Sequence, residues 1–391
     1  MRKNSGDRSH LTIHESTRNF NCFCMNNDLI YQLALTQTPH IGHVHARILA
    51  QQFESAEAIF KAPSGILEKI DGIGPIRARS IKQFNNFSAA EKEIAFIEKY
   101  RINTLFLKDE NYPQRLLHCY DPPTLLFYRG NANLNASRVV AIIGTRNHTE
   151  YGKHITDTLV KELAAFDVLI VSGLALGIDA LAHKAAVKHH LATTGVLAHG
   201  LDTLYPPQHT TLAKEMLKHN GGLLTEFPSN TPPDKHNFPT RNRIVAGMSD
   251  AIVVIETGIR GGSMITAELA NSYNKDVFAI PGKTTDSKSC GCNQLIKNNK
   301  AMLLTDAQQL ADTMGWTEPV KPPARKQQEI FIELTGPEKM VVTLLTEKDT
   351  VHIDELTIKS GISSSAAAAA ILNLELQNII QCLPGKIYKL L

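Results

Sequence analysis

An arginine and several glycines stand where this chain could hold a phosphate group. Arg146 follows Gly144 by two residues, and Gly144 comes directly after an apolar run. Glycines let the backbone come close to a ligand, and a planar guanidinium can pair with two phosphate oxygens at once. Glycines in comparable positions are Gly173, Gly177, Gly261 and Gly262. These residue types predict anion binding; the alternative is that Arg146 makes an ion pair within the chain.

The densest basic stretch of the central region runs from Lys235 to Arg243 and contains one aromatic residue, Phe238. Lysine and arginine side chains can follow a nucleic-acid backbone, while an aromatic ring offers a base a stacking face. We expect a basic loop here that continues into an apolar helix at Ile244. Two alternatives stay open, namely Phe238 as a core residue and partly structural roles for Arg241 and Arg243.

No catalytic constellation accompanies these residues. Acids and histidines near the predicted strand ends form no recognisable nucleophile–base pair or metal trio; they are Asp179, Asp202, Glu226, His183, His199 and His209. A carboxylate that begins a helix, as Asp179 does, is more often a cap than an acid. The G-x-G-x-x-G and G-x-x-x-x-G-K-[ST] nucleotide motifs are absent. We expect no catalytic residue, no metal and no cofactor.

Apolar runs that alternate with helical stretches predict the elements that position the glycines and Arg146. The runs of buried-strand type are residues 138–144, 168–172, 193–198, 222–226, 251–255 and 277–280. Continuous apolar strands alternating with helices predict a parallel sheet covered on both faces. Such a doubly wound α/β sheet binds its ligand at the carboxyl ends of the strands, which is where the glycines lie.

The chain divides into five segments. Residues 1–26 read as a disordered or spurious arm, 27–100 as a helical domain, 101–316 as the α/β domain, 317–334 as a linker rich in Pro, Lys and Arg, and 335–391 as a small third domain. In the helical domain, residues 70–78 and 39–46 resemble the hairpins of a helix-hairpin-helix. Their glycines could present backbone N–H groups to DNA or simply join helices.

The composition bounds the class of protein. Of 391 residues 43% are hydrophobic, and the net charge is only +3, so a nucleic-acid surface must be local. No apolar run reaches the roughly 20 residues that span a bilayer. Six cysteines are few for this length, which favours a cytoplasmic protein with free thiols. A zinc site at one of the two C-x-C pairs is the less favoured alternative.

Several motifs, in order along the chain, resemble the DNA-processing protein A family (DprA, also called Smf). They are Ile143-Gly-Thr-Arg-Asn147, Ser172-Gly-Leu-Ala-Leu-Gly-Ile-Asp179, Phe238-Pro-Thr-Arg-Asn-Arg-Ile244, Gly262-Ser-Met-Ile-Thr-Ala267 and Ala279-Ile-Pro-Gly282. The resemblance covers nearly the whole chain from about Met25. It implies a Rossmann-like domain that binds single-stranded DNA, a helix-hairpin-helix or SAM-like domain before it and a winged helix after it.

The resemblance also implies function and site residues. A member of the family is expected to have no enzymatic activity, to protect incoming single-stranded DNA and load RecA onto it in natural transformation, and to dimerise through the Rossmann-like domain. Arg146 is expected to contact a phosphate, Lys235 the backbone and Phe238 a base. The full set of expected DNA-binding residues is Gly144, Thr145, Arg146, Ser172, Gly173, Lys235, Phe238, Arg241, Asn242, Arg243, Gly262 and Ser263. Leu176 departs from the family, since many relatives have a basic residue there.

Two other functions remain open. Gly261-Gly262-Ser263 before a helix is similar to the phosphate loop of nucleotide phosphoribohydrolases, although their Pro-Gly-Gly-x-Gly-Thr pattern is absent. A duplex-DNA regulator would instead use the winged helix, with a recognition helix that begins near Ser364. The alanines at 366–370 offer no side chain that reads bases, which favours a protein-interaction or regulatory role for this domain.

Overall fold

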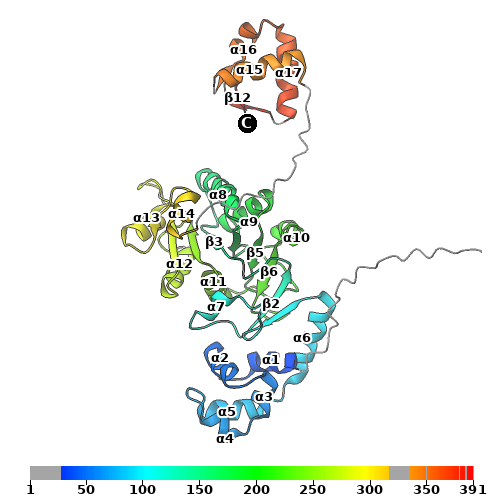
Figure 1. The fold of residues 1–391 in the computed structure, drawn as a ribbon, viewed down its shortest axis with the longest axis vertical. Coiled ribbons are helices and arrows are strands. Elements are labelled where there is room, and N and C mark those ends of the chain that lie inside the picture. Colours follow the sequence, from blue (N-terminus) through cyan, green and yellow to red (C-terminus); the bar gives the residue numbers. More distant parts are fainter. Residues whose placement is uncertain (1–27, 317–333, 349, 378, 384, 391) are drawn as a thin grey trace, which may run out of the picture. The chain divides into compact units, whose positions relative to one another are not determined.

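The computed structural model describes residues 28–316 and 334–390, apart from 349, 378 and 384. The predicted arm, and all but the last residue of the predicted linker, lie outside these ranges. The chain forms two compact units, Met1–Pro322 and Pro323–Leu391 (Figure 1). Within the described ranges, no helix is long and apolar enough to cross a membrane.

From residue 28 on, the first unit begins with six short helices: α1 (Asp28–Gln37), α2 (His43–Gln52), α3 (Ala56–Lys61), α4 (Ser64–Glu68), α5 (Gly74–Gln83) and α6 (Phe87–Tyr100). Gly72 and Gly74 have φ of 79° and 61°, which glycine adopts without strain, and they form the turn into α5. Arg77 donates hydrogen bonds to the carbonyl oxygens of His40 (3.2 Å) and Gly72 (3.1 Å). This side chain therefore joins the two predicted hairpins.

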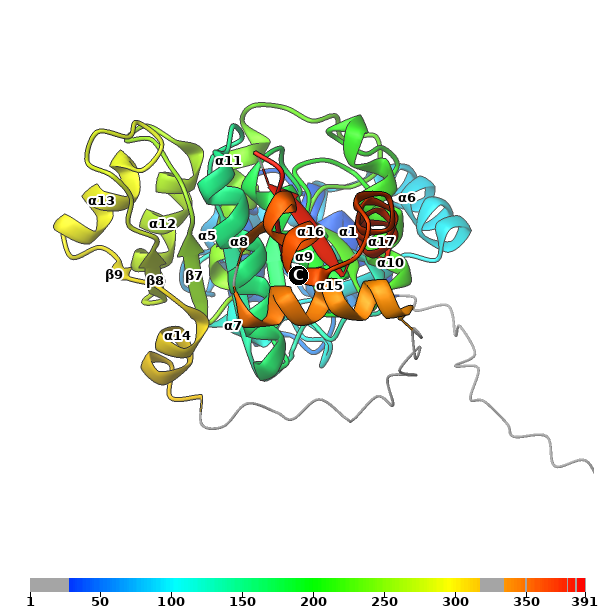
Figure 2. The same cartoon turned by 90° about the horizontal axis from the view of Figure 1, so that it is seen from above.

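A nine-stranded sheet forms the centre of the first unit. Its strands are β1 (Asn103–Phe106), β2 (Leu125–Gly130), β3 (Val139–Ile143), β4 (Leu169–Ser172), β5 (Thr193–Val196), β6 (Gly222–Thr225), β7 (Ala251–Val254), β8 (Asp276–Ala279) and β9 (Met302–Leu303). Their order is β1-β2-β6-β5-β4-β3-β7-β8-β9, and Figure 2 shows β7, β8 and β9 in sequence toward one edge. The strands from β6 to β9 are parallel, which confirms the predicted fold class.

The other edge of the sheet contains two strands that lie outside the predicted runs. β1 pairs with β2 and β2 with β6, both in antiparallel fashion. Only α7 (Gln114–Leu117) lies between β1 and β2. This short connection does not form the long helical crossover that joins parallel neighbours.

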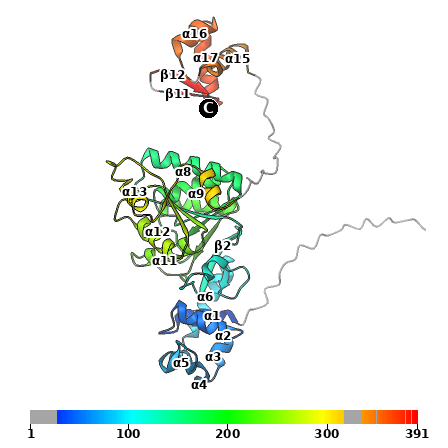
Figure 3. The same cartoon turned by 60° about the vertical axis from the view of Figure 1, so that its left-hand side comes forward.

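Helices cover both faces of the sheet (Figure 3). Val140 and Ile142 of β3 pack with α8 (Glu150–Leu163), α9 (Ile178–Lys188) and α14 (Ala307–Thr313). The alternate residues Ala141 and Ile143 pack with α11 (Asn237–Gly247) and α12 (Gly262–Ser272). The remaining helices of this unit are η1 (Ala164–Phe166), η2 (Pro207–His209), α10 (Thr210–Lys218) and α13 (Cys290–Lys297).

The strand order places a crevice beside β3. The chain runs from β3 outward through β4, β5 and β6, and then returns to β7 on the other side of β3. The loops that follow strands on the two sides of such a reversal diverge, which leaves room for a ligand at the carboxyl ends. The loops after β3, β4 and β7 therefore face one another.

The second unit contains α15 (Gly336–Glu347), β10 (Val351–His352), α16 (Ile353–Ser360), α17 (Ser364–Leu376), β11 (Ile380–Leu383) and β12 (Ile387–Leu390). Its strands form an antiparallel sheet in the order β10-β12-β11. This is the predicted winged helix. Leu372 and Leu376 of α17 are 56% and 74% exposed, and the helix contains no lysine or arginine. Its exposed face thus carries alanines and leucines beside Ser364, Ser365 and Asn373, and no positive charge.

Candidate nucleic-acid interface

A cavity of about 550 Å³ opens at the carboxyl edge of the sheet. The loops after β3, β4 and β7 and one side of α11 form its walls. All predicted site residues except Ser172 and Arg243 line it; they are Gly144, Thr145, Arg146, Gly173, Lys235, Phe238, Arg241, Asn242, Gly262 and Ser263. Residues far apart in the sequence therefore meet at one site, as the parallel sheet predicts.

Glycines pack the first two loops against each other. A Cβ atom on Gly177, whose φ is 81°, would lie 2.2 Å from the carbonyl oxygen of Thr145. A Cβ atom on Gly144 would lie 2.6 Å from the side chain of Ile178. The backbone N–H of Ile178 donates to the Thr145 carbonyl at 3.2 Å. This wall of the cavity is therefore formed by close backbone contact.

The N-terminus of α12 supplies a third wall. Ser263 Oγ donates to Thr257 Oγ1 at 2.7 Å, which fixes the loop between β7 and the helix. A Cβ atom on Gly262 would meet nothing within 4 Å, because this residue faces the open cavity. The first N–H groups of a helix have no partner within it and carry its positive dipole end. This wall attracts anions without a charged side chain.

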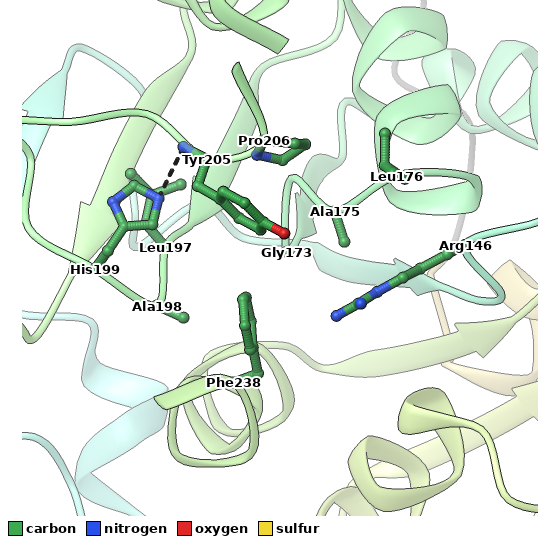
Figure 4. A pocket seen from close by; sticks show the side chains of 10 residues that line it. All are labelled: Arg146, Gly173, Ala175, Leu176, Leu197, Ala198, His199, Tyr205, Pro206 and Phe238. Atoms are coloured by element: carbon green, nitrogen blue, oxygen red, sulfur yellow. Dashed lines mark hydrogen bonds between the residues drawn. The ribbon is translucent and has the colours of Figure 1, made fainter. Parts of the chain in front are cut away.

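Arg146 and Phe238 also line a smaller adjoining pocket together with Tyr205 (Figure 4), and we call this place the mouth of the cavity. The Arg146 guanidinium carbon lies 5.4 Å from the Phe238 ring centroid, and the Tyr205 ring lies 6.1 Å from it on a tilted plane. Arg146 is exposed, and it has no ion-pair partner among residues 28–316. Within this range the alternative of an intrachain ion pair is therefore not found, and the polar edge of the side chain is available to an anion.

His199 holds the backbone of Tyr205 in place. The backbone N–H of Tyr205 donates to His199 Nε2 at 3.2 Å, while His199 Nδ1 lies 2.8 Å from the Gly200 carbonyl oxygen. Both ring nitrogens are used if Nδ1 carries the proton and donates. The sequence prediction did not include Tyr205 among the site residues, although it lines the smaller pocket beside Arg146 and Phe238.

Arg241 lines the same cavity but lies beneath its surface. It is 4% exposed, and its Nη1 donates to the carbonyl oxygens of Gly173 and Val196. A Cβ atom on Gly173 would lie 2.1 Å from Arg241 Nη1, so the glycine makes room for the guanidinium. Asp179 accepts from the N–H groups of Gly173 (3.1 Å) and Ala175 (3.4 Å). Arg241 and Asp179 thus hold one backbone turn from two sides.

Burial governs the electrostatics of this layer. It raises the pKa of the Asp179 carboxyl, and the positive charge of Arg241 acts in the opposite direction. Burial also lowers the pKa of His183 to about 3, and His209 and Arg241 add to that shift. His183 Nδ1 bonds Thr193 Oγ1 at 2.7 Å. We refer to Asp179, His183, His209 and Arg241 as the buried layer of the cavity.

Ser172 and Arg243 lie outside the cavity lining. Ser172 is fully buried, and its Oγ donates to the Ile142 carbonyl at 2.6 Å. Arg243 is 7% exposed, donates to Glu226 and to the Asp121 carbonyl, and lies 3.1 Å from His43 Nε2. The structure therefore gives both side chains partners within the chain and supports the structural alternative for Arg243.

The basic stretch is not the loop that was predicted. α11 begins at Asn237, so Lys235 precedes the helix and Phe238 lies in its first turn. Pro239 is tolerated there because the first turn needs no backbone donor. Phe238 and Arg241 are three residues apart on one face of the helix, and both line the cavity. Arg243, two residues beyond Arg241, points to another side and lies outside the lining.

Metal-ligating side chains do not cluster in the described ranges, where no group of three or more His, Cys, Asp or Glu could hold an ion. Cys290 and Cys292 are free thiols that lie near the carbonyl oxygens of Ser287 and Val254. The other C-x-C pair, Cys22 and Cys24, lies outside the described residues.

Family models match most of the chain. A model described as DNA recombination-mediator protein A matches residues 103–315, a helix-hairpin-helix model matches 31–94, and a DprA winged-helix model matches 321–386. Protein Smf of Synechocystis sp. is 32% identical over 93% of this chain and 99% of its own length. The DNA processing protein DprA of Bacillus subtilis is 39% identical over 56% of this chain and 72% of its own length.

Two solved structures are also similar to the chain. One is DNA processing protein A of Streptococcus pneumoniae, with a TM-score of 0.62 and 30% identity over 72% of this chain and 97% of that one. The other is DNA processing protein A of Helicobacter pylori, with a TM-score of 0.50 and 34% identity over 55% of this chain and 96% of that one. The latter structure is described as showing a single-stranded DNA binding mode.

Proposed function

Because the chain belongs to the DNA recombination-mediator protein A family, whose members are named DprA or Smf, we propose that it binds single-stranded DNA in the cavity at the carboxyl edge of its sheet. The H. pylori relative, whose structure is described as showing single-stranded DNA binding, supports this proposal. It is also supported by the chemistry of the cavity, which offers positive charge and an aromatic ring together.

One observation carries the proposal. Arg146 and Lys235 are exposed at the cavity and have no ion-pair partner in residues 28–316. Both lie close to the N-terminus of α12 and to Phe238, which line the same cavity. Cations next to an aromatic ring are the features with which proteins hold single strands without regard to sequence. The glycine-packed walls allow the sugar–phosphate backbone to come close.

The finer role follows as part of the same proposal. The protein protects incoming single strands and loads RecA onto them during natural transformation, without catalysing a reaction itself. It acts in the cytoplasm as a dimer formed through the Rossmann-like domain. The exposed apolar side chains Met302 and Leu303 on the edge strand β9 support a contact between copies there. RecA loading is tested by the rate at which RecA assembles on a strand already covered by a single-strand-binding protein.

The variant Arg146→Ala with Lys235→Ala tests the binding site. We expect weak binding to an unstructured oligonucleotide in a gel-shift titration, and a salt slope smaller by about 0.7 for each phosphate that is no longer neutralised. Lys161→Ala with Lys218→Ala is the matched control, because both lysines are exposed and neither lines the cavity. Normal binding by the double variant would place the site elsewhere.

Two assays, a binding competition and a nucleotide-release assay, separate the other functions. A duplex-DNA regulator would prefer some duplex sequence over the single strand, whereas we expect the single strand to win against every duplex competitor. A nucleotide phosphoribohydrolase would release free base from a nucleoside monophosphate. We expect no release, measured by chromatography of the incubated nucleotide.

A further inference from the structure

The loops beside the cavity differ sharply in charge. On the side of β4 and β5, residues 173–183 and 197–206 contain no lysine or arginine. Leu176 and Tyr205 are exposed there, 43% and 45% respectively. On the side of β7 and β8, the following loops contain Arg260, Lys283 and Lys288. A strand that leaves the cavity therefore meets an apolar rim in one direction and positive charge in the other.

The sheet topology brings these three cations to the edge that carries the cavity. β7 and β8 are parallel neighbours, so the loops that follow them emerge side by side (Figure 2). The N–H of Gly291, at the start of α13, donates to the Thr257 carbonyl at 2.9 Å. Thr257, Gly258 and Gly261 line the cavity, and Arg260 lies between them in sequence. The β7 loop is thus shared by the cavity and the neighbouring surface.

The three cations are available to a ligand. Arg260 and Lys283 are exposed and Lys288 is partly exposed, and none has an ion-pair partner among residues 28–316. The acid of this loop, Asp286, accepts from the Lys288 N–H (3.0 Å) and from Ser289 Oγ (2.9 Å). Its carboxylate is therefore held within the loop and does not neutralise a particular lysine by direct contact.

We propose that Arg260, Lys283 and Lys288 form a basic strip that continues the single-strand site beyond the cavity, across the loops after β7 and β8. This inference rests on the proposed function and adds the path of the strand to it. β8 lies two β-strand spacings from β3, about 10 Å. A DNA single strand anchored at Arg146 therefore reaches the basic strip within a few nucleotides. The strip binds phosphates and makes no demand on base sequence.

DNA single strands of increasing length test the basic strip. Oligothymidines, from the shortest that the wild-type protein binds to several times that length, are titrated against Arg260→Ala/Lys283→Ala/Lys288→Ala. We expect the triple variant to bind the shortest strand as the wild type does and to benefit less from added length. On the long strand its salt slope should be smaller by about 2, which corresponds to three phosphates that are no longer neutralised.

Two further variants keep the test sharp. Lys161→Ala/Lys214→Ala/Lys218→Ala removes the same charge from exposed positions of α8 and α10 outside the cavity lining, and its affinity should rise with strand length as that of the wild type does. Lys283→Glu alone should weaken long strands selectively. An unchanged salt slope for the triple variant on long strands would overturn the basic strip, as would equal weakening on the shortest strand. Failure of the wild type to bind any strand would instead overturn the proposed function.

Discussion

The mouth of the cavity and the buried layer beneath it each contain an arginine, and the two arginines serve opposite purposes. Arg146 and Arg241 line one cavity, yet Arg146 is exposed over an aromatic ring while Arg241 is buried against backbone carbonyls. The Arg146 guanidinium is open to solvent, whereas Arg241 directs Nη1 to two carbonyl oxygens of the chain itself. The comparison teaches that lining a cavity does not make an arginine a ligand contact; the exposure of its guanidinium does.

Replacing each arginine by methionine tests this contrast most strongly. Arg241→Met removes a buried cation near Asp179 and leaves two carbonyls without their donor, so the free energy of unfolding should fall by about 3–5 kcal/mol. Arg146→Met makes the same chemical change at the exposed mouth and should leave stability within about 0.5 kcal/mol of the wild type. Urea unfolding measures both. A stable Arg241→Met protein that no longer binds single strands would contradict the assignment of Arg241 to stability and of Arg146 to binding.

Phe238 belongs to the mouth and should affect binding instead of stability. If a base stacks on its ring, Phe238→Ala should cost about 1–3 kcal/mol of binding free energy. Arg146 must then share or leave the ring face that it covers. Fluorescence anisotropy with a labelled oligonucleotide measures the loss, and Phe238→Tyr is the control that keeps the ring. A lowered melting temperature with unchanged affinity would show instead that Phe238 is a core residue.

His183 belongs to the buried layer and should make stability depend on pH. Its pKa in the folded chain is about 3 against an ordinary value of 6.5, so on acidification the unfolded chain takes up this proton first. Neutral His183 contributes fully to the free energy of unfolding above pH 6.5. This contribution should be lost as the pH falls toward 3, by up to about 1.4 kcal/mol per pH unit.

The comparison of His183→Gln with His219→Gln isolates this effect. Unfolding free energies are measured between pH 7 and pH 5, a range that begins above the ordinary pKa of 6.5 and stays above the folded-state pKa of about 3. We expect a flatter pH profile for His183→Gln alone, because His219 is exposed. Parallel profiles for the wild type and His183→Gln would contradict a neutral buried His183.

The smallest effect is expected from a charge added at Leu176, beside the mouth. Leu176→Lys places a cation where the family resemblance led us to expect one, and the salt slope of single-strand binding should increase by about 0.7. Leu176→Met is the neutral control. If the lysine variant keeps the wild-type slope, the strand does not pass the turn between β4 and α9.

Much of the fold and of the site could be predicted from the sequence. Strands buried on both faces appear as continuous apolar runs, so β3 and β7 were found within a residue or two of their observed ends. Parallel strands place their following loops at one edge, and this rule was enough to bring Gly144, Gly173 and Gly262 to one cavity. Local pattern and topology together identified the site.

The remainder depended on contacts between distant residues. Nothing near Arg241 in the sequence indicates that Gly173 and Val196 accept its hydrogen bonds, and nothing near Arg243 indicates Glu226. The sequence therefore left structural roles open for both arginines but did not identify their partners. The antiparallel edge formed by β1 and β2 was missed because their connection contains only a short helix and resembles another strand–helix alternation.

The close approach of Gly173 to Arg241 has a consequence for engineering this protein. A methyl group at position 173 would occupy the space of the guanidinium, so positions 173 and 241 behave as a single unit of change. Gly173→Ala should be tolerated only in a background where residue 241 has been shortened, and libraries that vary one position alone will discard combinations that fold. Redesign of the cavity should therefore treat these two positions as a linked pair.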